Sequence, residues 1–373
     1  MASSLTACQF ADRSDDGSEK PSVALMTTEK AKTVDVEDDG DPRIDHSRLP
    51  THSGYLYIKI PRSEGSSSTL IKHDTQGHIM WAATITPAII DTYYDDDSKV
   101  PQAPADSLLY SRLIGYAVVS PDGRYASFIL RPTDVAGPYE QDDDTYDHDD
   151  DDTTTYTVAD QRTYVVVIET ETGKTVRTEE LKGLILGQAL TNDTLAVETS
   201  QSYYPGGDGH GAISAFSLNR PTAQATTIPT EQWLVGATSD SLLLTPSNMS
   251  ERELIRAEPL TRMSTRGDVV ETVSGVTDVY LGGWIERVTD GTSGTDSASP
   301  KEVVNLSTGV ATDVTGLAVR EVTFPTAAGL LVSQETSTGE GRNKTTTSTP
   351  RFWLSAADDG HPHTENLEQF TNK

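Results

Sequence analysis

The sequence is almost without cysteine, and its single one, Cys8, stands near the beginning of the 373 residues. One thiol allows neither a disulfide within the chain nor a cysteine-based zinc site, because both need several cysteines. Long apolar runs are also missing. The most apolar windows, such as residues 113–119, have the length of a strand and not the roughly 20 residues of a membrane-spanning helix.

Basic residues are scarce as well. The chain has 29 Lys and Arg against 57 Asp and Glu, which gives a formal net charge of −28. A chain this acidic repels phosphate backbones and anionic lipid head groups, so we expect no nucleic-acid partner and no direct binding to a membrane surface. An acidic surface favours solubility and can hold cations.

Helical periodicity is nearly absent, and from Gly54 onward short β-rich runs alternate with Gly, Asp, Asn and Pro turns. The clearest unit covers residues 114–181. It predicts four strands, at 114–119, 124–130, 163–169 and 174–179, with tight turns after the first and the third.

The same order of strands and turns recurs along the chain. The recurring runs are 184–200 with 211–228; 233–248 with 253–260 and 268–273; 276–288 with 301–316; and 318–335 with 351–367. Upstream, 54–60 and 69–85 resemble the later three strands of another unit. That first unit lacks its innermost strand, which an exchange between the two ends of the chain would supply.

These runs make about six units of about 45–50 residues, a period typical of propeller blades. A four-stranded sheet leaves both faces bare, and radial packing against two neighbours buries them. We therefore predict an all-β fold, a β-propeller of four-stranded antiparallel blades. Six blades are expected, or seven if residues 22–50 are structured. Residues 1–50 are expected to form a lipobox and a flexible acidic tether, and residues 51–373 one propeller domain with acidic insertions near 91–107 and 139–156.

Two pieces of sequence resemble known propeller repeats. "SPDGRYASFIL" at 120–130 resembles the Ser-Pro-Asp-Gly turn of TolB-type, WD-like repeats, and "KHDTQGHIMW" at 72–81 resembles a strand-turn-strand of quinoprotein-type repeats. Both resemblances imply propeller architecture. They imply no function, because the fold hosts enzymes, scaffolds and sensors alike.

Two acidic clusters are candidate cation sites. They comprise Asp95, Asp96 and Asp97 in one insertion, and Asp142, Asp143, Asp144, Asp147, Asp149 and Asp150 in the other. Clustered carboxylates suit calcium, and the two clusters could share an ion at one rim of the ring. The second run lacks the Gly and the closing Glu of an EF-hand loop, and the alternative is a solvated surface loop.

The glycine-rich stretch "SYYPGGDGHG" at 202–211 is a candidate ligand rim. Tyr203, Tyr204, Asp208 and His210 could line a ligand mouth there, because glycines let the backbone approach a ligand closely. The alternative is a long hairpin loop whose Pro and Gly serve turn geometry. HExxH, G-x-S-x-G, P-loop and dinucleotide patterns are all missing, so no catalytic residue is assigned.

The residues around Cys8 resemble a bacterial lipobox. Leu5-Thr6-Ala7-Cys8 has the leucine, two small residues and cysteine of that motif, and a hydrophilic stretch follows it. The resemblance implies a lipidated cysteine and an extracytoplasmic protein. The residues ahead of Leu5 supply neither the charged start nor the apolar core of a signal peptide. Either a signal precedes Met1 or the match is accidental.

Taken together, the sequence predicts a non-enzymatic, extracytoplasmic binding or scaffold module, anchored to the membrane only through a lipid. Its expected partners are a protein, a peptide or a cell-wall glycan, and we expect a monomer. Two alternatives stay open. One is a propeller hydrolase or lactonase with a metal in the central channel, and the other is a cation-responsive extracellular sensor.

Overall fold

A computed structural model shows the fold and describes most of the chain from residue 20 onward. The described residues are 20–33, 48–59, 67–86, 89–90, 117–130, 133–134, 156–157, 162–182, 184–200, 202–203, 212–246, 257–291, 299–324, 327–338, 345–355, 360–365 and 367.

The first sheet has five antiparallel strands in the order β1-β5-β4-β3-β2. They are β1 (Ser22–Leu25), β2 (Arg48–Thr51), β3 (Gly54–Lys59), β4 (Ser68–His73) and β5 (Ile79–Thr86), and the helix α1 (Thr28–Lys32) follows β1. The innermost strand of this sheet is therefore β2, which directly precedes β3. The predicted strand exchange between the chain ends was wrong, because residues 48–51 supply the strand that seemed to be missing.

The two sheets that follow have four strands each. The second contains β7 (Ala117–Val119), β8 (Tyr125–Leu130), β11 (Arg162–Glu169) and β12 (Thr175–Lys182), close to the predicted ranges. The third contains β13 (Leu184–Leu190), β14 (Thr194–Ser200), β16 (Ala212–Ser217) and β17 (Thr226–Ile228).

The two remaining large sheets have seven strands and four strands. The seven strands are β18 (Trp233–Ala237), β19 (Ser241–Thr245), β20 (Glu258–Ser264), β21 (Val269–Tyr280), β22 (Trp284–Val288), β23 (Lys301–Asn305) and β24 (Ala311–Asp313), with the short 3-10 turn η3 (Leu281–Gly283) after β21. The last sheet contains β25 (Ala318–Phe324), β26 (Ala327–Thr338), β27 (Thr345–Ser355) and β28 (Pro362–His363).

One strand belongs to two consecutive units. The first half of β21 pairs with β20 and its second half pairs with β22, and Gly275 lies between them with φ +78°. The sequence predicted a break near this glycine, between strands at 268–273 and 276–288. The backbone instead continues through it, which joins two units into the seven-stranded sheet.

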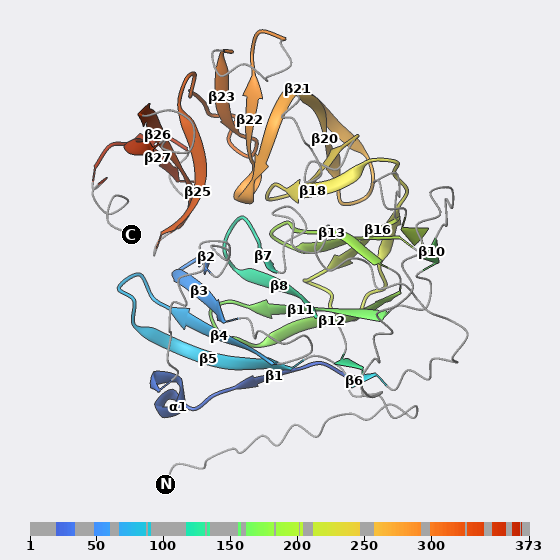
Figure 1. The fold of residues 1–373 in the computed structure, drawn as a ribbon. Coiled ribbons are helices and arrows are strands. Elements are labelled where there is room, and N and C mark those ends of the chain that lie inside the picture. The colour runs from blue at the N-terminus through green and yellow to red at the C-terminus, as the bar shows by residue number, and fades with distance from the viewer. Residues whose placement is uncertain are drawn as a thin grey trace, which may run out of the picture.

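The inner strands form a closed ring of contacts (Figure 1). Along the ring β2 contacts β7, β7 contacts β13, β13 contacts β18 and β18 contacts η3, while β26 also contacts η3 and β25 and β26 return to β2. The protein is thus an all-β propeller of antiparallel sheets. The number of blades stays a prediction, because it depends on the whole chain and the structure describes only part of it.

The core consists of apolar layers between neighbouring sheets. In β8 every residue is buried, and the side chains alternate between two layers. Phe128 and Leu130 pack toward the first sheet, while Tyr125 and Ile129 pack toward the third. Because both faces of a middle strand are covered, it has a continuous apolar character, as the sequence of residues 125–130 shows.

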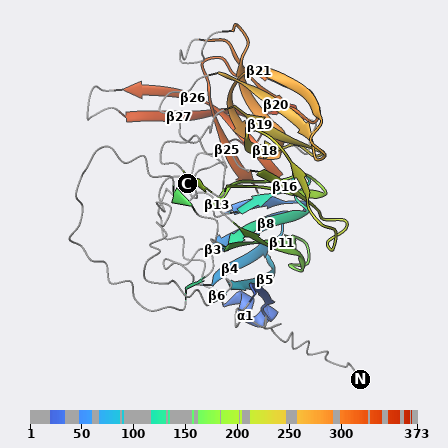
Figure 2. The ribbon, with the colours of Figure 1, turned by 90° about the vertical axis from the view of Figure 1, so that its right-hand side faces the viewer.

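The two ends of the sheets differ. Connections from the first strand to the second, and from the third to the fourth, are short turns, such as residues 120–124 and 170–174. We call this end the turn face. The longer connections from the second strand to the third, and the crossing from β5 to β7, leave from the opposite end, the loop face. In Figure 2 the strands β26 and β27 project from that side of the propeller.

Candidate functional site

Most residues that the sequence singles out lie outside the described residues. This applies to Cys8, to the aspartates of both acidic clusters (Asp95–Asp97 and Asp142–Asp150), and to Tyr204, Asp208 and His210. Their proposed roles stay predictions. Tyr203 belongs to the described strand β15 (Ser202–Tyr203), where its backbone pairs with Tyr156.

Two small sheets on the loop face connect the segments that contain these residues. Strand β6 (Ile89–Ile90) pairs in parallel with β9 (Thr133–Asp134), and β10 (Tyr156–Thr157) pairs antiparallel with β15. The first acidic cluster follows β6, the second lies between β9 and β10, and the glycine-rich stretch follows β15. The fold thus places the borders of all three predicted segments on one face.

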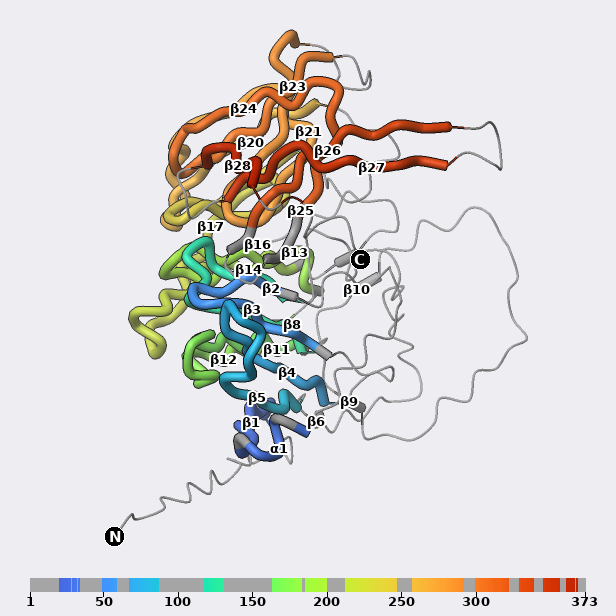
Figure 3. Tube along the Cα trace, turned by 90° about the vertical axis from the view of Figure 1, so that its left-hand side faces the viewer, coloured from blue at the N-terminus to red at the C-terminus, as the bar shows by residue number. Residues whose placement is uncertain are grey.

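The loop face also has a projecting hairpin that the sequence did not predict. We call the paired ranges 334–338 of β26 and 345–349 of β27 the arm (Figure 3). Residues 335–338 and 345–349 are exposed. The sequence predicted only strands ending at 335 and starting at 351. The hydroxyl-rich runs "ETST" and "TTTST", on either side of a glycine-containing "GEGRN", were the available signal for a longer hairpin.

On the turn face, successive turns are hydrogen-bonded to one another. The His52 amide donates to the Gly123 carbonyl at 3.1 Å, the Asp122 amide donates to Asn192 Oδ1 at 3.1 Å, and the Asn192 amide donates to the Ser239 carbonyl at 2.9 Å. These bonds run from the first unit to the fourth. These hydrogen bonds occupy backbone and side-chain groups of the turn face that a ligand could otherwise bind.

Three of these turns, in the second, third and fourth units, share one side-chain pattern. Each has a Ser or Thr hydroxyl that donates to an Asp two residues later, at 2.6 Å in Ser120–Asp122 and 3.0 Å in Thr238–Asp240. The third example is Thr191–Asp193. The sequences "TND" and "TSD" thus have the same turn chemistry as the "SPD" turn.

A buried lysine joins the first two sheets. Lys72 is 1% exposed, and its Nζ donates to Thr51 Oγ1 at 2.7 Å and to the His73 carbonyl at 3.1 Å. Glu171, from the turn after β11, lies 3.8 Å from the same nitrogen. Burial lowers the pKa of Lys72, and the carboxylates of Glu171 and Asp74 oppose that shift. Because hydroxyl and carbonyl oxygens hold the ammonium in place, its environment is that of a structural group.

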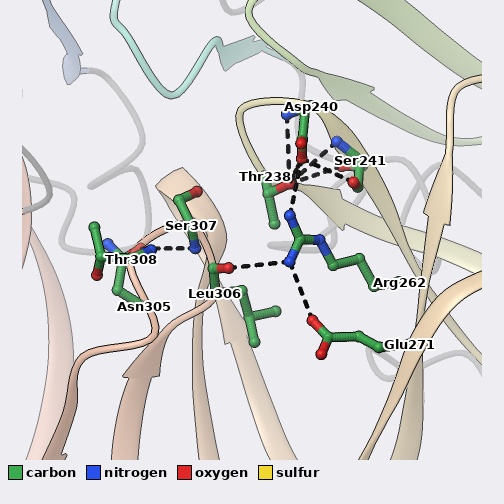
Figure 4. Close-up of polar contacts among 9 residues, drawn as sticks. All are labelled: Thr238, Asp240, Ser241, Arg262, Glu271, Asn305, Leu306, Ser307 and Thr308. Atoms are coloured by element: carbon green, nitrogen blue, oxygen red, sulfur yellow. Dashed lines mark hydrogen bonds and ion pairs between the residues drawn. The ribbon is translucent and has the colours of Figure 1, made fainter.

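Two arginines make similar links between units. Arg177 of β12 donates to the carbonyls of Ser217 at 2.9 Å and Ala223 at 2.6 Å in the next sheet. Arg262 of β20 donates to Asp240 at 3.0 Å, to Glu271 at 3.1 Å and to the Leu306 carbonyl at 3.2 Å (Figure 4). Residues with these roles were not identified from sequence, because a single basic residue in a strand has no distinguishing pattern.

A fully buried carboxylate lies at another seam. Glu198 of β14 is 0% exposed, and its Oε2 accepts a hydrogen bond from the Leu234 amide of β18 at 2.8 Å. Both β13 and β18 contain an irregularity in register beside it, at residues 185–187 and 234–236. Bulges of this kind free backbone groups from the ladder, and here a side chain satisfies one of them.

Within the described ranges no three His, Cys, Asp or Glu side chains are grouped as metal ligands. In the same ranges no helix is long and apolar enough to cross a bilayer. Lys72, Arg177 and Arg262 are occupied in links between units. The loop face has the borders of the three predicted segments and the projecting arm, so we take it as the candidate functional site.

No family model and no curated protein matches the chain. Among solved structures, the chain is similar to BamB from Moraxella catarrhalis, with 9% identity and a TM-score of 0.32 over 84% of this chain and 85% of that one. It is also similar to the acylaminoacyl peptidase of Pyrococcus horikoshii, with 11% identity and a TM-score of 0.38 over 88% of this chain and 52% of that one. The chain spans about half the length of the peptidase. Similarity at this level says nothing about the activity of this chain.

Proposed function

We propose that the protein is a non-enzymatic binding or scaffold module that takes its partner on the loop face. The observation that supports this most is the difference between the two faces. Turns on one face are hydrogen-bonded to each other and are closed by Lys72 and Arg262. The other face has the long connections, the two small sheets and the arm. Loops on a rigid scaffold are the usual place for binding residues.

The partner is a protein, a peptide or a cell-wall glycan, and the module acts as a monomer. It works outside the cytoplasm, held at the membrane by a lipid on Cys8. The support for this location is the lipobox-like "LTAC", which coincides with the only cysteine of the chain. A single diacylated cysteine with a hydrophilic tether would leave the propeller free to present its loop face.

The anchor is tested by lipid labelling. With a bacterial signal segment placed ahead of Met1, we expect Cys8 to incorporate labelled palmitate and the protein to partition into the detergent phase. The variant Cys8→Ser should remain in the aqueous phase, because it has no thiol to acylate. Label in both proteins, or in neither, would contradict the proposed anchor.

Binding on the loop face is tested with insoluble peptidoglycan and a phage-displayed peptide library as probes. We expect Tyr203→Ala/Tyr204→Ala, at the end of β15, to lower the bound fraction of the selected probe about fivefold, since aromatic residues dominate binding surfaces. The matched control is Thr75→Ala/Gln76→Ala on the exposed turn after β4, which should bind as the wild type does. Equal loss in the control would place the binding elsewhere.

A further inference from the structure

The arm has two outer edges to which no described strand is paired. On one side β25 pairs with β26 only as far as Ser333, and on the other β28 pairs with β27 only at Trp353 and Leu354. Residues 334–338 and 345–349 therefore pair with each other and, among the described residues, with no further strand. Edge strands of this kind present a row of backbone N–H and C=O groups to another chain.

The two edges differ in their protection. Proteins protect exposed edges with charged side chains, prolines or bulges. The edge of β26 contains Glu335, whereas residues 345–349 of β27 are all Thr or Ser. A register irregularity after Val332 and the proline at position 350 both lie at the base of the arm. The edge of β27 is thus the one that is open to pairing.

We propose that an extended segment of a partner polypeptide, rich in β-branched and hydroxyl residues, adds to the edge of β27 as a further antiparallel strand. This rests on the proposed function and names its mode of recognition. Residues 345–349 are uncharged and lie between Lys344 and Arg351, so backbone pairing and not charge selects the partner.

The side chains of the arm indicate what such a segment contains. In a strand, alternate residues point to opposite faces, so Thr345, Thr347 and Thr349 share one face and Thr346 and Ser348 share the other. Cross-strand neighbours of threonine that pack well are β-branched or hydroxyl residues. Main-chain hydrogen bonds give the affinity in this mode, so tolerance of side-chain sequence is expected.

The probe is a fluorescent, end-blocked peptide of the sequence Lys-Thr-Val-Thr-Val-Thr-Lys, and binding is followed by anisotropy at physiological salt. Replacing residues 335–348 with Asn-Gly shortens the arm to one residue pair, because Gln334 and Thr349 are a paired position that a two-residue turn can close, and Thr349 has the backbone N–H that this turn needs. We expect this shortened variant to bind the probe about tenfold more weakly than the full chain. Its melting temperature reports whether the propeller is intact.

A matched pair of variants tests the edge. Thr345→Lys/Thr347→Lys adds two charges to β27, and Thr336→Lys/Thr338→Lys adds the same charge at the directly opposite positions of β26. We expect the first to weaken binding about fivefold and the second to leave it within about twofold, because like charges repel most when directly opposite. A probe in which every backbone amide is N-methylated has the same charge but no N–H to donate to the ladder, and it should bind about tenfold more weakly.

Three results would overturn the inference. Equal binding of the N-methylated probe would show attraction by charge alone. Equal binding to the shortened variant would place the peptide away from the arm. A dimer in sedimentation that disappears in the shortened variant would make the occupant a second copy of this chain. If the arm is dispensable while Tyr203→Ala/Tyr204→Ala still loses its selected probe, the proposed function stands and only the arm's role fails.

Discussion

Replacing Gly123 with alanine is expected to lower the free energy of unfolding by about 3 kcal/mol. Gly123 has φ +70°, a conformation that residues with a side chain rarely adopt. An alanine Cβ at this position would lie 2.4 Å from the His52 amide nitrogen and 2.6 Å from the Thr51 carbonyl carbon. Neither backbone atom can move without displacing β2 from the second sheet.

The position of Gly123 makes this effect larger than an ordinary turn substitution. Its carbonyl accepts hydrogen bonds from the His52 amide at 3.1 Å and from Thr170 Oγ1 at 2.7 Å. Moving the turn would therefore lengthen bonds to two other turns. A loss of this size would also reduce the cooperativity of unfolding, since the first and second sheets meet here.

The control is Gly77→Ala, which is measured in the same denaturant titration. Gly77 has φ +83°, but no atom lies within 4 Å of the position of an added Cβ. We expect a loss of about 1 kcal/mol there, from backbone strain alone. If the two variants lose equal stability, the close approach of Gly123 to His52 contributes nothing.

Replacing Arg262 with alanine is expected to lower the free energy of unfolding by about 2 kcal/mol at pH 7. The side chain is only 17% exposed and joins the turn after β18 to the turn after β23. Alanine would leave the Leu306 carbonyl and two carboxylates without this donor. The contact to the carbonyl is independent of pH, whereas the contacts to Asp240 and Glu271 need ionised acids.

The pH dependence follows from Asp240. The hydroxyl of Ser241, together with the Arg262 guanidinium, holds the pKa of Asp240 below its ordinary value of 3.8. A carboxyl whose pKa is lower in the folded state stabilises the fold above its unfolded pKa, and this contribution is lost as the pH falls through the folded value. The stability difference between wild type and Arg262→Ala should therefore be full at neutral pH and shrink below about pH 4.

The matched control is Arg266→Ala, on the turn that follows β20. Arg266 is exposed, and its substitution removes the same charge from the same region. We expect a change within about 0.5 kcal/mol, with no added dependence on acid. Chemical denaturation at pH 7 and at pH 3 provides both values. A constant difference between wild type and Arg262→Ala across this range would show that the carboxylate contacts are not involved.

The sequence predicted those strands and turns whose pattern lies entirely within their own residues. Residues 125–130 are apolar on both faces, and the "SPDG" turn before them requires a glycine at positive φ, so both could be recognised. The strand at residues 48–51 could not, because it has four residues and contains Pro50. It is an inner edge strand, a place where a missing N–H is tolerated.

The candidate site was predictable in composition but not in position. The acidic clusters and the glycine-rich stretch are visible in the sequence, yet nothing in it reveals that β6 pairs with β9, because two-residue strands have no periodicity. The links made by Lys72, Arg177 and Glu198 depend on contacts between units that are distant in sequence. The packing of neighbouring sheets buries these three side chains.

The continuity of β21 has a consequence for how the molecule opens. Repeat proteins often unfold in pieces, because each unit contacts only its neighbours. Here the backbone from Val269 to Tyr280 belongs to two units at once, so separating them would break both ladders. Amide hydrogens on both sides of Gly275 should therefore exchange with solvent as one group. The two units that share β21 would then unfold together, whereas the other units can unfold singly.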